Sequence, residues 1–207
     1  EFFYSRQQAD PGSTAPGGTG EAILTGESFV GDEPFVVAYG DTIIHSNGRS
    51  SFIERMIQAH ETSDALVTIG VRPVPDNITH LYGIVQPSEG EVTDTDAFRF
   101  SDIIEKPPQG EAPTNLAVSA RYVFSPRIFD CIRADAEAEA EEGITGAIRA
   151  LIRDGHPVQC VSLNDDETRY DIGNHESYYK AFIDYALDDP ECGDAIRTYI
   201  AQKGNVS

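Results

Sequence analysis

Short apolar runs bounded by turn residues alternate along this chain with stretches in which apolar residues recur at helical spacing. The runs have the length of buried strands, and the one at 35–39 ends directly in Gly-Asp. The pattern predicts strands over 2–4, 35–39, 65–71, 81–85, 117–124, 157–163 and 170–173, and another that ends at 103–104. It predicts helices over 21–29, 50–61, 126–132, 144–152, 177–187 and 194–201.

Cap and turn residues support these boundaries. Ser50 or Ser51 is placed to cap the helix at 50–61, and the Gly-, Pro- and Ser-rich stretch 10–20 predicts a loop. The acidic, alanine-rich stretch 134–142 lacks an apolar stripe, so we expect a solvated helix or loop there. Strands alternate with helices and no repeat or linker divides them, which predicts one three-layer α/β domain over 1–207.

The charge of the chain narrows its partners. Among 207 residues, 35 are acidic and 15 are basic, which gives a formal charge of −20. Such a surface repels phosphate backbones and anionic lipids, so we expect no nucleic-acid partner and no membrane binding. An anionic small molecule would need the few basic residues to gather where it binds.

The cysteines and the hydropathy indicate the compartment. Cys131, Cys160 and Cys192 are odd in number and far apart, which predicts neither a disulfide framework nor a metal site. No apolar run reaches the length of a membrane span, and no signal peptide is recognisable. We therefore expect a cytoplasmic protein, and we also expect a homo-oligomer.

Two aspartates stand at the ends of predicted strands. Asp41 comes after the strand at 35–39, and Asp171 lies in the segment Arg-Tyr-Asp-Ile-Gly-Asn. Ligands of open α/β sheets collect at the carboxyl ends of strands, so both carboxylates could face one cleft and share Mg²⁺ with a phosphate. The alternative is that each aspartate caps a turn or a helix.

A basic and a glycine-rich segment are the next candidates. Glu105 and Lys106 stand at a predicted strand end before two prolines, where they could hold a sugar hydroxyl and a phosphate, or form a surface ion pair. Gly17-Gly18-Thr19-Gly20 precedes a helix and resembles a loop that brings backbone amides close to a ligand, but it matches neither a P-loop nor a dinucleotide fingerprint.

The histidines offer less. We expect His60 on a helix surface and His45, His80 and His156 in loops, while His175 draws interest only because it follows Asp171 by four residues. No Ser-His-Asp or Cys-His arrangement is legible, so the sequence does not indicate nucleophilic catalysis.

In their order along the chain, these segments resemble the prokaryotic UTP–glucose-1-phosphate uridylyltransferases. The matching stretches cover nearly the whole sequence, and they are 3–7, 18–24, 29–37 with 40–41, 81–85, 104–107, 115–118 with 121–123 and 126–130, 141–148, 170–174 and 178–187. The resemblance implies a nucleotidyltransferase fold with a mixed, mostly parallel sheet. It also implies the Mg²⁺-dependent reaction of UTP with glucose 1-phosphate, which gives UDP-glucose and diphosphate.

The resemblance assigns roles to individual positions. Asp41 and Asp171 would hold Mg²⁺, and Lys106 would bind the sugar phosphate. The uracil would be bound by Gln7 and the backbone of Gly18 to Gly20, and glucose hydroxyls would be bound by Gly83, Glu105, Asn115 and Glu141. The sugar-phosphate oxygen would attack the α-phosphorus in line, without a protein nucleophile.

The chain departs from the family pattern in three places. The signature loop G-x-G-T-R and its strand precede the matched region and are absent, so we expect a longer native polypeptide and weak binding and turnover from this chain alone. His175 stands where many members carry lysine, which removes a fixed positive charge from the phosphate site. The stretch 8–16 is longer than the usual link to the glycine pair.

Two alternatives stay open at this point. With a histidine at position 175 the chain also resembles the thymidylyltransferases. The same type of reaction could therefore transfer thymidylyl, or could use another sugar 1-phosphate. A catalytically silent subunit that keeps the sugar-nucleotide pocket is a reading from another class.

Overall fold

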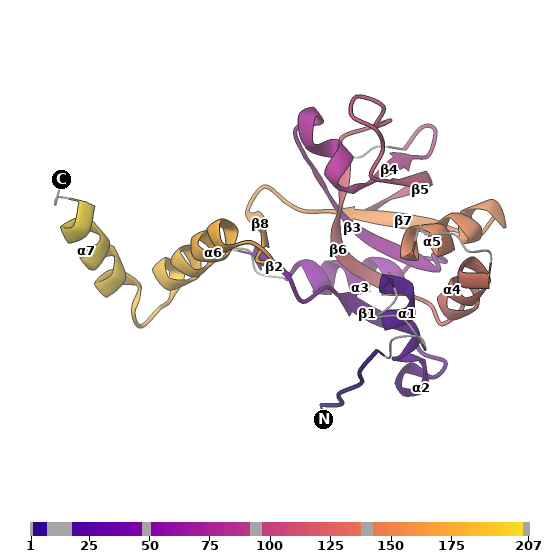
Figure 1. The fold of residues 1–207 in the computed structure, drawn as a ribbon, viewed down its shortest axis with the longest axis horizontal. Coiled ribbons are helices and arrows are strands. Elements are labelled where there is room, and N and C mark those ends of the chain that lie inside the picture. Colours follow the sequence, from indigo (N-terminus) through magenta and orange to yellow (C-terminus); the bar gives the residue numbers. More distant parts are fainter. Residues whose placement is uncertain (1, 8–17, 47–50, 92–96, 138–142, 205–207) are drawn as a thin grey trace, which may run out of the picture.

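The computed structural model describes residues 2–7, 18–46, 51–91, 97–137 and 143–204. Figure 1 shows a twisted sheet covered by helices on both faces and a pair of helices that extends away from this body. The six strands of the sheet, in spatial order, are β1 (Phe35–Ala38), β6 (Leu116–Phe124), β3 (Val67–Pro73), β7 (Val158–Ser162), β5 (Ala97–Glu105) and β4 (Gly83–Pro87).

The sheet is mixed, which confirms the expected α/β class, but it is not mostly parallel. Within the described residues β3 and β7 form the parallel pair, and the other pairings are antiparallel. Two strands run in the direction opposite to the other four, and each of the two lies between strands that share a direction. β6 lies between β1 and β3, and β5 lies between β7 and β4.

Helices complete the three expected layers. On one face, α1 (Thr19–Leu24), α4 (Ile128–Glu137) and α5 (Ile144–Arg153) pack against the sheet through Ile23, Phe129 and Ile148. On the other face, α3 (Phe52–Glu61) buries Phe52 and Met56 against β6 and β7. Ser51 caps α3 in a capping box with Glu54, which confirms one of the two expected caps.

A second, two-stranded sheet lies beside the main one. It pairs β2 (Thr42–Ser46) with β8 (Glu167–Asp171) in antiparallel register. Only the end of β8 is predicted from the sequence, because β2 is short, follows β1 almost directly and has no long apolar run. This β2–β8 ribbon carries the chain from the main sheet to α6.

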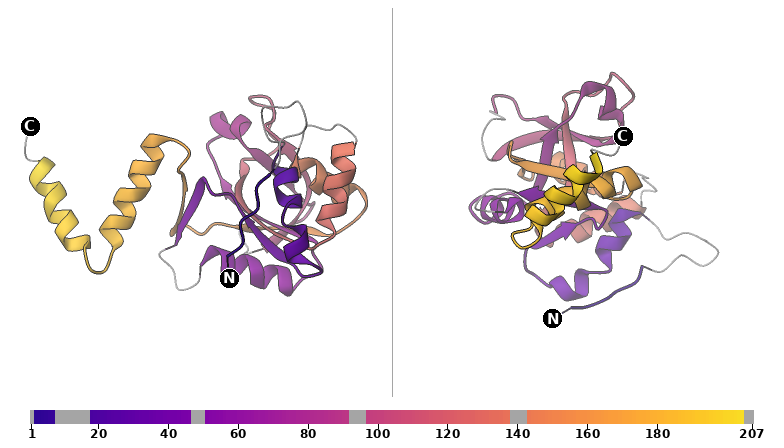
Figure 2. Two further views of the ribbon diagram at one scale, coloured as in Figure 1. Left: turned by 60° about the horizontal axis from the view of Figure 1, so that its bottom comes forward. Right: turned by 90° about the vertical axis from the view of Figure 1, so that its left-hand side faces the viewer.

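The last two helices, α6 (His175–Asp188) and α7 (Gly193–Gly204), form an arm that projects from the body (Figure 1 and the left view of Figure 2). The remaining elements are α2 (Glu27–Val30), which follows α1 after Gly26, and a 3₁₀ helix, η1 (Asp76–Leu81). Across the described residues, every helix is too short or too polar to span a bilayer.

Several local expectations are wrong. The stretch 2–4 is extended but belongs to no strand, and its three aromatic side chains are exposed. His45 lies in β2 and His80 in η1 rather than in loops. His60 is buried, not on a helix surface, because its face of α3 packs on the sheet.

Candidate active site

A polar cavity of about 690 Å³ opens where β1, β5 and β8 end and where α5 begins. It brings together six residues singled out from the sequence, namely Gly18, Asp41, Gly83, Glu105, Lys106 and Asp171. The other lining residues were not singled out as site residues, and they include Tyr39, Tyr82, Thr145 and Arg169. Segments that are distant in sequence thus meet at one site.

The two aspartates are neighbours, and the backbone holds them together. Asp171 is the last residue of β8 and pairs with Thr42, the residue after Asp41. A Cβ built on Gly173 would lie 3.2 Å from Asp171 Oδ1 and 4.0 Å from Asp41 Oδ2, so glycine leaves room between the carboxylates. Asp41 and Asp171 therefore line the same cavity.

This carboxylate pair suits a hard divalent cation. Mg²⁺ prefers carboxylate oxygens and keeps open positions for water and phosphate. Within the described residues no group of three or more His, Cys, Asp or Glu side chains converges, and Asp41 and Asp171 form a set of two carboxylates on the cavity wall. Such a set matches a metal that is shared with a phosphorylated substrate rather than a structural metal.

Glu105 and Lys106 line the same cavity from the end of β5. Thr145 Oγ1 donates a 3.0 Å hydrogen bond to Glu105 Oε2, which fixes that carboxylate over Gly83. A Cβ on Gly83 would lie 3.2 Å from the same oxygen, so a larger residue there would displace Glu105. The backbone of Lys106 has a positive φ of 44°, and its amide donates to the carbonyl of Tyr82 at 3.1 Å.

Two tyrosines form the inner wall. The rings of Tyr39 and Tyr122 lie 5.7 Å apart between centroids. Burial raises the pKa of Tyr39, and burial raises the pKa of Tyr122 well above its ordinary value of 10.0. Both hydroxyls therefore stay protonated at neutral pH and remain hydrogen-bond donors and acceptors.

The remaining predicted site residues lie elsewhere. Gln7 is beside the cavity, where its amide donates to Gly18 O at 3.4 Å and Glu21 Oε2 at 3.0 Å. Gly20 is buried in α1, and a Cβ there would lie 3.0 Å from Ile132, so this glycine serves helix packing. Glu141 falls outside the described residues.

Asn115 and His175 are separated from the cavity lining. Asn115 lines a smaller cavity of about 360 Å³ together with Asp76 and Thr79. His175 is the first residue of α6, is exposed and stacks on Tyr179. The sequence pattern did not reveal this, because Asn115 directly precedes β6 and His175 begins α6, and the side-chain direction at an element boundary depends on the fold.

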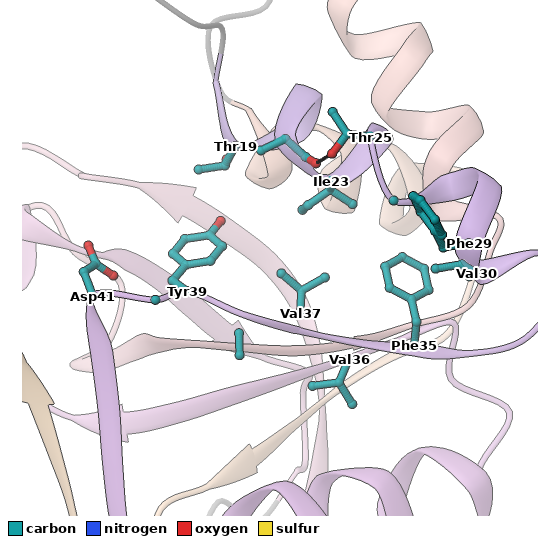
Figure 3. A pocket seen from close by; sticks show the side chains of 14 residues that line it. Thr19, Ile23, Thr25, Phe29, Val30, Phe35, Val36, Val37, Tyr39 and Asp41 are labelled. Atoms are coloured by element: carbon teal, nitrogen blue, oxygen red, sulfur yellow. Dashed lines mark hydrogen bonds between the residues drawn. The ribbon is translucent and has the colours of Figure 1, made fainter. Parts of the chain in front are cut away.

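An apolar groove adjoins the polar cavity. Its volume is about 650 Å³, and it runs between α1–α2 and β1. Figure 3 shows apolar side chains such as Phe29 and Val37 along it, with Thr19, Tyr39 and Asp41 toward one end. The groove lacks the convergent charged groups of the polar cavity, so we place the chemistry in the latter.

The chain is similar in sequence to known proteins. The sequence profile of the nucleotidyl transferase family matches residues 4–187. The chain is 37% identical over 204 residues to a UTP–glucose-1-phosphate uridylyltransferase of Staphylococcus haemolyticus, with 98% of this chain and 66% of the relative covered. A Staphylococcus epidermidis protein of the same name is 36% identical, with 97% and 65% covered.

Solved structures agree with the sequence relatives. A UDP-glucose pyrophosphorylase from Acinetobacter baumannii superposes with a TM-score of 0.79 at 31% identity, covering 91% of this chain and 63% of that one. A UDP-glucose pyrophosphorylase in complex with UDP-glucose gives a TM-score of 0.77 at 28% identity, with 91% and 67% covered. The chain thus spans slightly less than two thirds of the length of the curated relatives above.

Proposed function

The chain belongs to the nucleotidyl transferase family, and from this premise we propose that it transfers uridylyl from UTP to glucose 1-phosphate, giving UDP-glucose and diphosphate. The observation that carries the proposal is the single polar cavity in which the Asp41–Asp171 pair faces Lys106 and Glu105. Such a transfer needs a carboxylate pair to hold a metal ion, a cation to bind the sugar phosphate, and hydrogen-bond acceptors for the sugar hydroxyls.

The reaction is an in-line displacement, which the protein would accelerate by positioning the reactants and by neutralising the charge of the phosphates. An oxygen of glucose 1-phosphate forms a bond to the α-phosphorus of UTP, and the bond from that phosphorus to the diphosphate breaks. Asp41 and Asp171 would hold Mg²⁺, which supplies charge neutralisation to the phosphates when bound. Lys106 would bind the phosphate of the sugar, and its backbone is held by Tyr82.

The geometry supports some substrate contacts more than others. Gly83 and Glu105 lie together in the cavity, where the Glu105 carboxylate can accept hydrogen bonds from glucose hydroxyls. Gly18 lines the cavity and bonds to Gln7, which supports a uracil site at that end. The proposed contacts of Gly20, Asn115 and His175 gain no such support from their positions.

Two further statements belong to this proposal. A cytoplasmic location is supported by the free thiols of Cys131, Cys160 and Cys192. A homo-oligomer is supported by the arm, on which Tyr178, Phe182 and Ile183 of α6 expose 46%, 65% and 43% of their surface. Self-association through this apolar arm predicts a mass above one chain in light scattering, and Phe182→Ser should reduce that mass.

The experiment that tests the proposed reaction measures diphosphate release and nucleotide-sugar formation with Mg²⁺ and glucose 1-phosphate. UTP and dTTP are compared side by side, and calorimetry records binding of UDP-glucose. Turnover with UTP supports the proposal, and preference for dTTP would replace it by thymidylyl transfer. Binding of UDP-glucose without turnover would instead indicate a binding subunit.

A further inference from the structure

Three arginines lie near one another in this strongly acidic chain, and one of them, Arg169, lines the polar cavity. Arg72 lies at the end of β3, Arg121 in β6 and Arg169 in β8. The guanidinium carbons of Arg72 and Arg169 lie 5.4 and 5.9 Å from the ring centroid of Tyr82, so one aromatic ring contacts both cations. Stacking of this kind stabilises each guanidinium but leaves its charge in place.

Like charges at this distance oppose one another, and the structure retains them. Burial and then the charge of Arg169 lower the pKa of Arg72, and the same two causes lower that of Arg121. Within the described residues, no carboxylate lies within 4.0 Å of any of the three guanidinium groups. The chain as a whole has 35 acidic residues, so the lack of a carboxylate in direct contact with these three arginines is a feature of this region and not of the composition.

The three arginines differ in what they can still bind. Arg121 donates to backbone carbonyls of Tyr39, Ala120 and Thr42 at 3.3, 2.9 and 2.5 Å, which is a structural role. Arg72 does not line the cavity, and its Nε is buried without a partner among the described residues.

Arg169 lines the cavity, and the hydrogen bond that the structure gives its side chain runs from Nη2 to Thr42 Oγ1 at 3.0 Å. It stands two residues before Asp171 on β8, so both side chains lie on the same face of that strand.

Charge balance indicates what Arg169 would meet. The carboxylates of Asp41 and Asp171 attract the neighbouring arginines, as their effects on the pKa values of Arg121 and Arg72 indicate. A divalent cation on those carboxylates would cancel this attraction and leave the arginines uncompensated. An anion that enters together with the cation restores the balance, and a guanidinium fits a phosphate through paired N–H groups.

We propose that Arg169 is a phosphate-binding residue of this cavity and that Tyr82, whose ring contacts both Arg169 and Arg72, is its positioning residue. The ligand group is a phosphoryl group, which glucose 1-phosphate or the nucleotide could supply. The inference rests on the proposed function for the identity of those ligands. It also explains how the site keeps a fixed positive charge on the β2–β8 ribbon although position 175 holds a histidine.

Calorimetric titrations test this with glucose 1-phosphate, UTP and inorganic diphosphate, each in EDTA and in Mg²⁺. Arg169→Gln should weaken binding of at least one of the three about ten- to a hundredfold, the range for losing a charge-assisted hydrogen bond. Arg169→Lys should recover part of the loss, and the ligand that loses affinity identifies the source of the phosphoryl group. Arg153→Gln, at a side chain 78% exposed on α5, is the matched control and should bind as the parent does.

Tyr82 has its own pair of variants. Tyr82→Leu removes the ring that both guanidinium groups contact and should weaken binding of the same ligand by a smaller factor, about threefold to tenfold, whereas Tyr82→Phe keeps the ring and should restore most of the affinity. Equal losses in the Leu and Phe variants would overturn the positioning role, because the ring face would then be irrelevant.

The outcomes separate this inference from the proposed function. Binding by the parent with no change in folded Arg169→Gln overturns the role of Arg169 and leaves the proposed function intact. Binding of inorganic diphosphate that depends on Arg169, without binding of UTP or glucose 1-phosphate, supports Arg169 and overturns the proposed function. Absence of binding to all three ligands overturns both.

Discussion

The backbone amide of Ile172 donates a 2.8 Å hydrogen bond to the carbonyl oxygen of Asp41. This bond continues the pairing of β2 with β8 past its last register pair, Thr42 with Asp171. The spacing of the two carboxylates is therefore fixed by main-chain contacts, and a side-chain change elsewhere in the cavity should leave it unaltered.

The carboxylate pair gives the first prediction. Asp41→Asn or Asp171→Asn should each lower Mg²⁺-dependent turnover by on the order of a hundredfold or more, because an amide neutralises half of the metal-binding charge. Calorimetry with Mg²⁺ and steady-state kinetics measure the effect, and circular dichroism checks the fold. Asp166→Asn, in the exposed turn before β8, should change neither. Turnover at the parental rate in both site variants would contradict the proposal that Asp41 and Asp171 hold the metal ion.

Lys106 gives the second. Lys106→Ala should weaken glucose 1-phosphate binding by roughly 1.5–3 kcal/mol, which is typical of losing a charge-assisted hydrogen bond. Isothermal titration of the sugar phosphate measures the loss. Lys180→Ala, on α6 and paired with Glu176, is the control and should bind normally. Unchanged affinity in a folded Lys106→Ala protein would place the sugar phosphate elsewhere.

The third prediction concerns pH and the buried His60, whose Nδ1 lies 3.0 Å from Thr68 Oγ1. Burial lowers the pKa of His60 below its usual 6.5. The unfolded chain therefore takes up this proton at a higher pH than the folded protein does. The stability that neutral His60 contributes is fully present above pH 6.5 and is lost as the pH falls from there toward the folded pKa.

Urea unfolding at pH 7.5 and at pH 5.5 measures this contribution. His60→Gln should show a smaller loss of unfolding free energy on acidification than the parent, since glutamine cannot take up a proton. His156→Gln, in the loop before β7, should keep the parental difference. If His60→Gln loses as much stability as the parent, other groups account for the acid sensitivity.

The fourth prediction addresses the ion pair between Arg55 of α3 and Glu167 of β8, which are 2.5 Å apart with 13% and 2% of their side chains exposed. Glu167 also accepts hydrogen bonds from Ser46 Oγ and from the amide of Asn164. Glu167→Gln should lower the unfolding free energy by about 3 kcal/mol, because it removes the negative charge from a buried ion pair.

Urea unfolding of the two proteins measures that loss. Glu176→Gln breaks an exposed pair with Lys180 on α6 and should leave stability nearly unchanged. A Glu167→Gln protein as stable as the parent would show that the ribbon is held to the core by packing alone.

Much of the main sheet and of its helices follows from local pattern. The apolar run at 35–39 becomes β1, and the serine-capped amphipathic stretch at 50–61 becomes α3, because the apolar residues of each have the spacing of the element they form. Strand direction does not follow from such runs. The insertion of β6 between β1 and β3 depends on long-range pairing that a single sequence does not display.

The candidate site shows the same division. Asp41 and Asp171 are predictable because each follows a strand, and Lys106 because lysines are scarce. Arg169 belongs to the same Arg-Tyr-Asp segment as Asp171, but its place in the cavity becomes visible only from the pairing of β8 with β2 and from its contact with Tyr82. His175 is exposed at the start of α6, an orientation that the sequence alone does not show.

The β2–β8 ribbon also sets the order in which the protein can become functional. Its strands are far apart in the chain, and the Ser46–Glu167 hydrogen bond closes a separation of 121 residues. Contacts of such long range form late in folding, because the entropy of closing the intervening loop is recovered only once the sheet is in place. Nascent chains would therefore be compact before they can bind a metal, and acquisition of Mg²⁺ affinity would mark the final folding step.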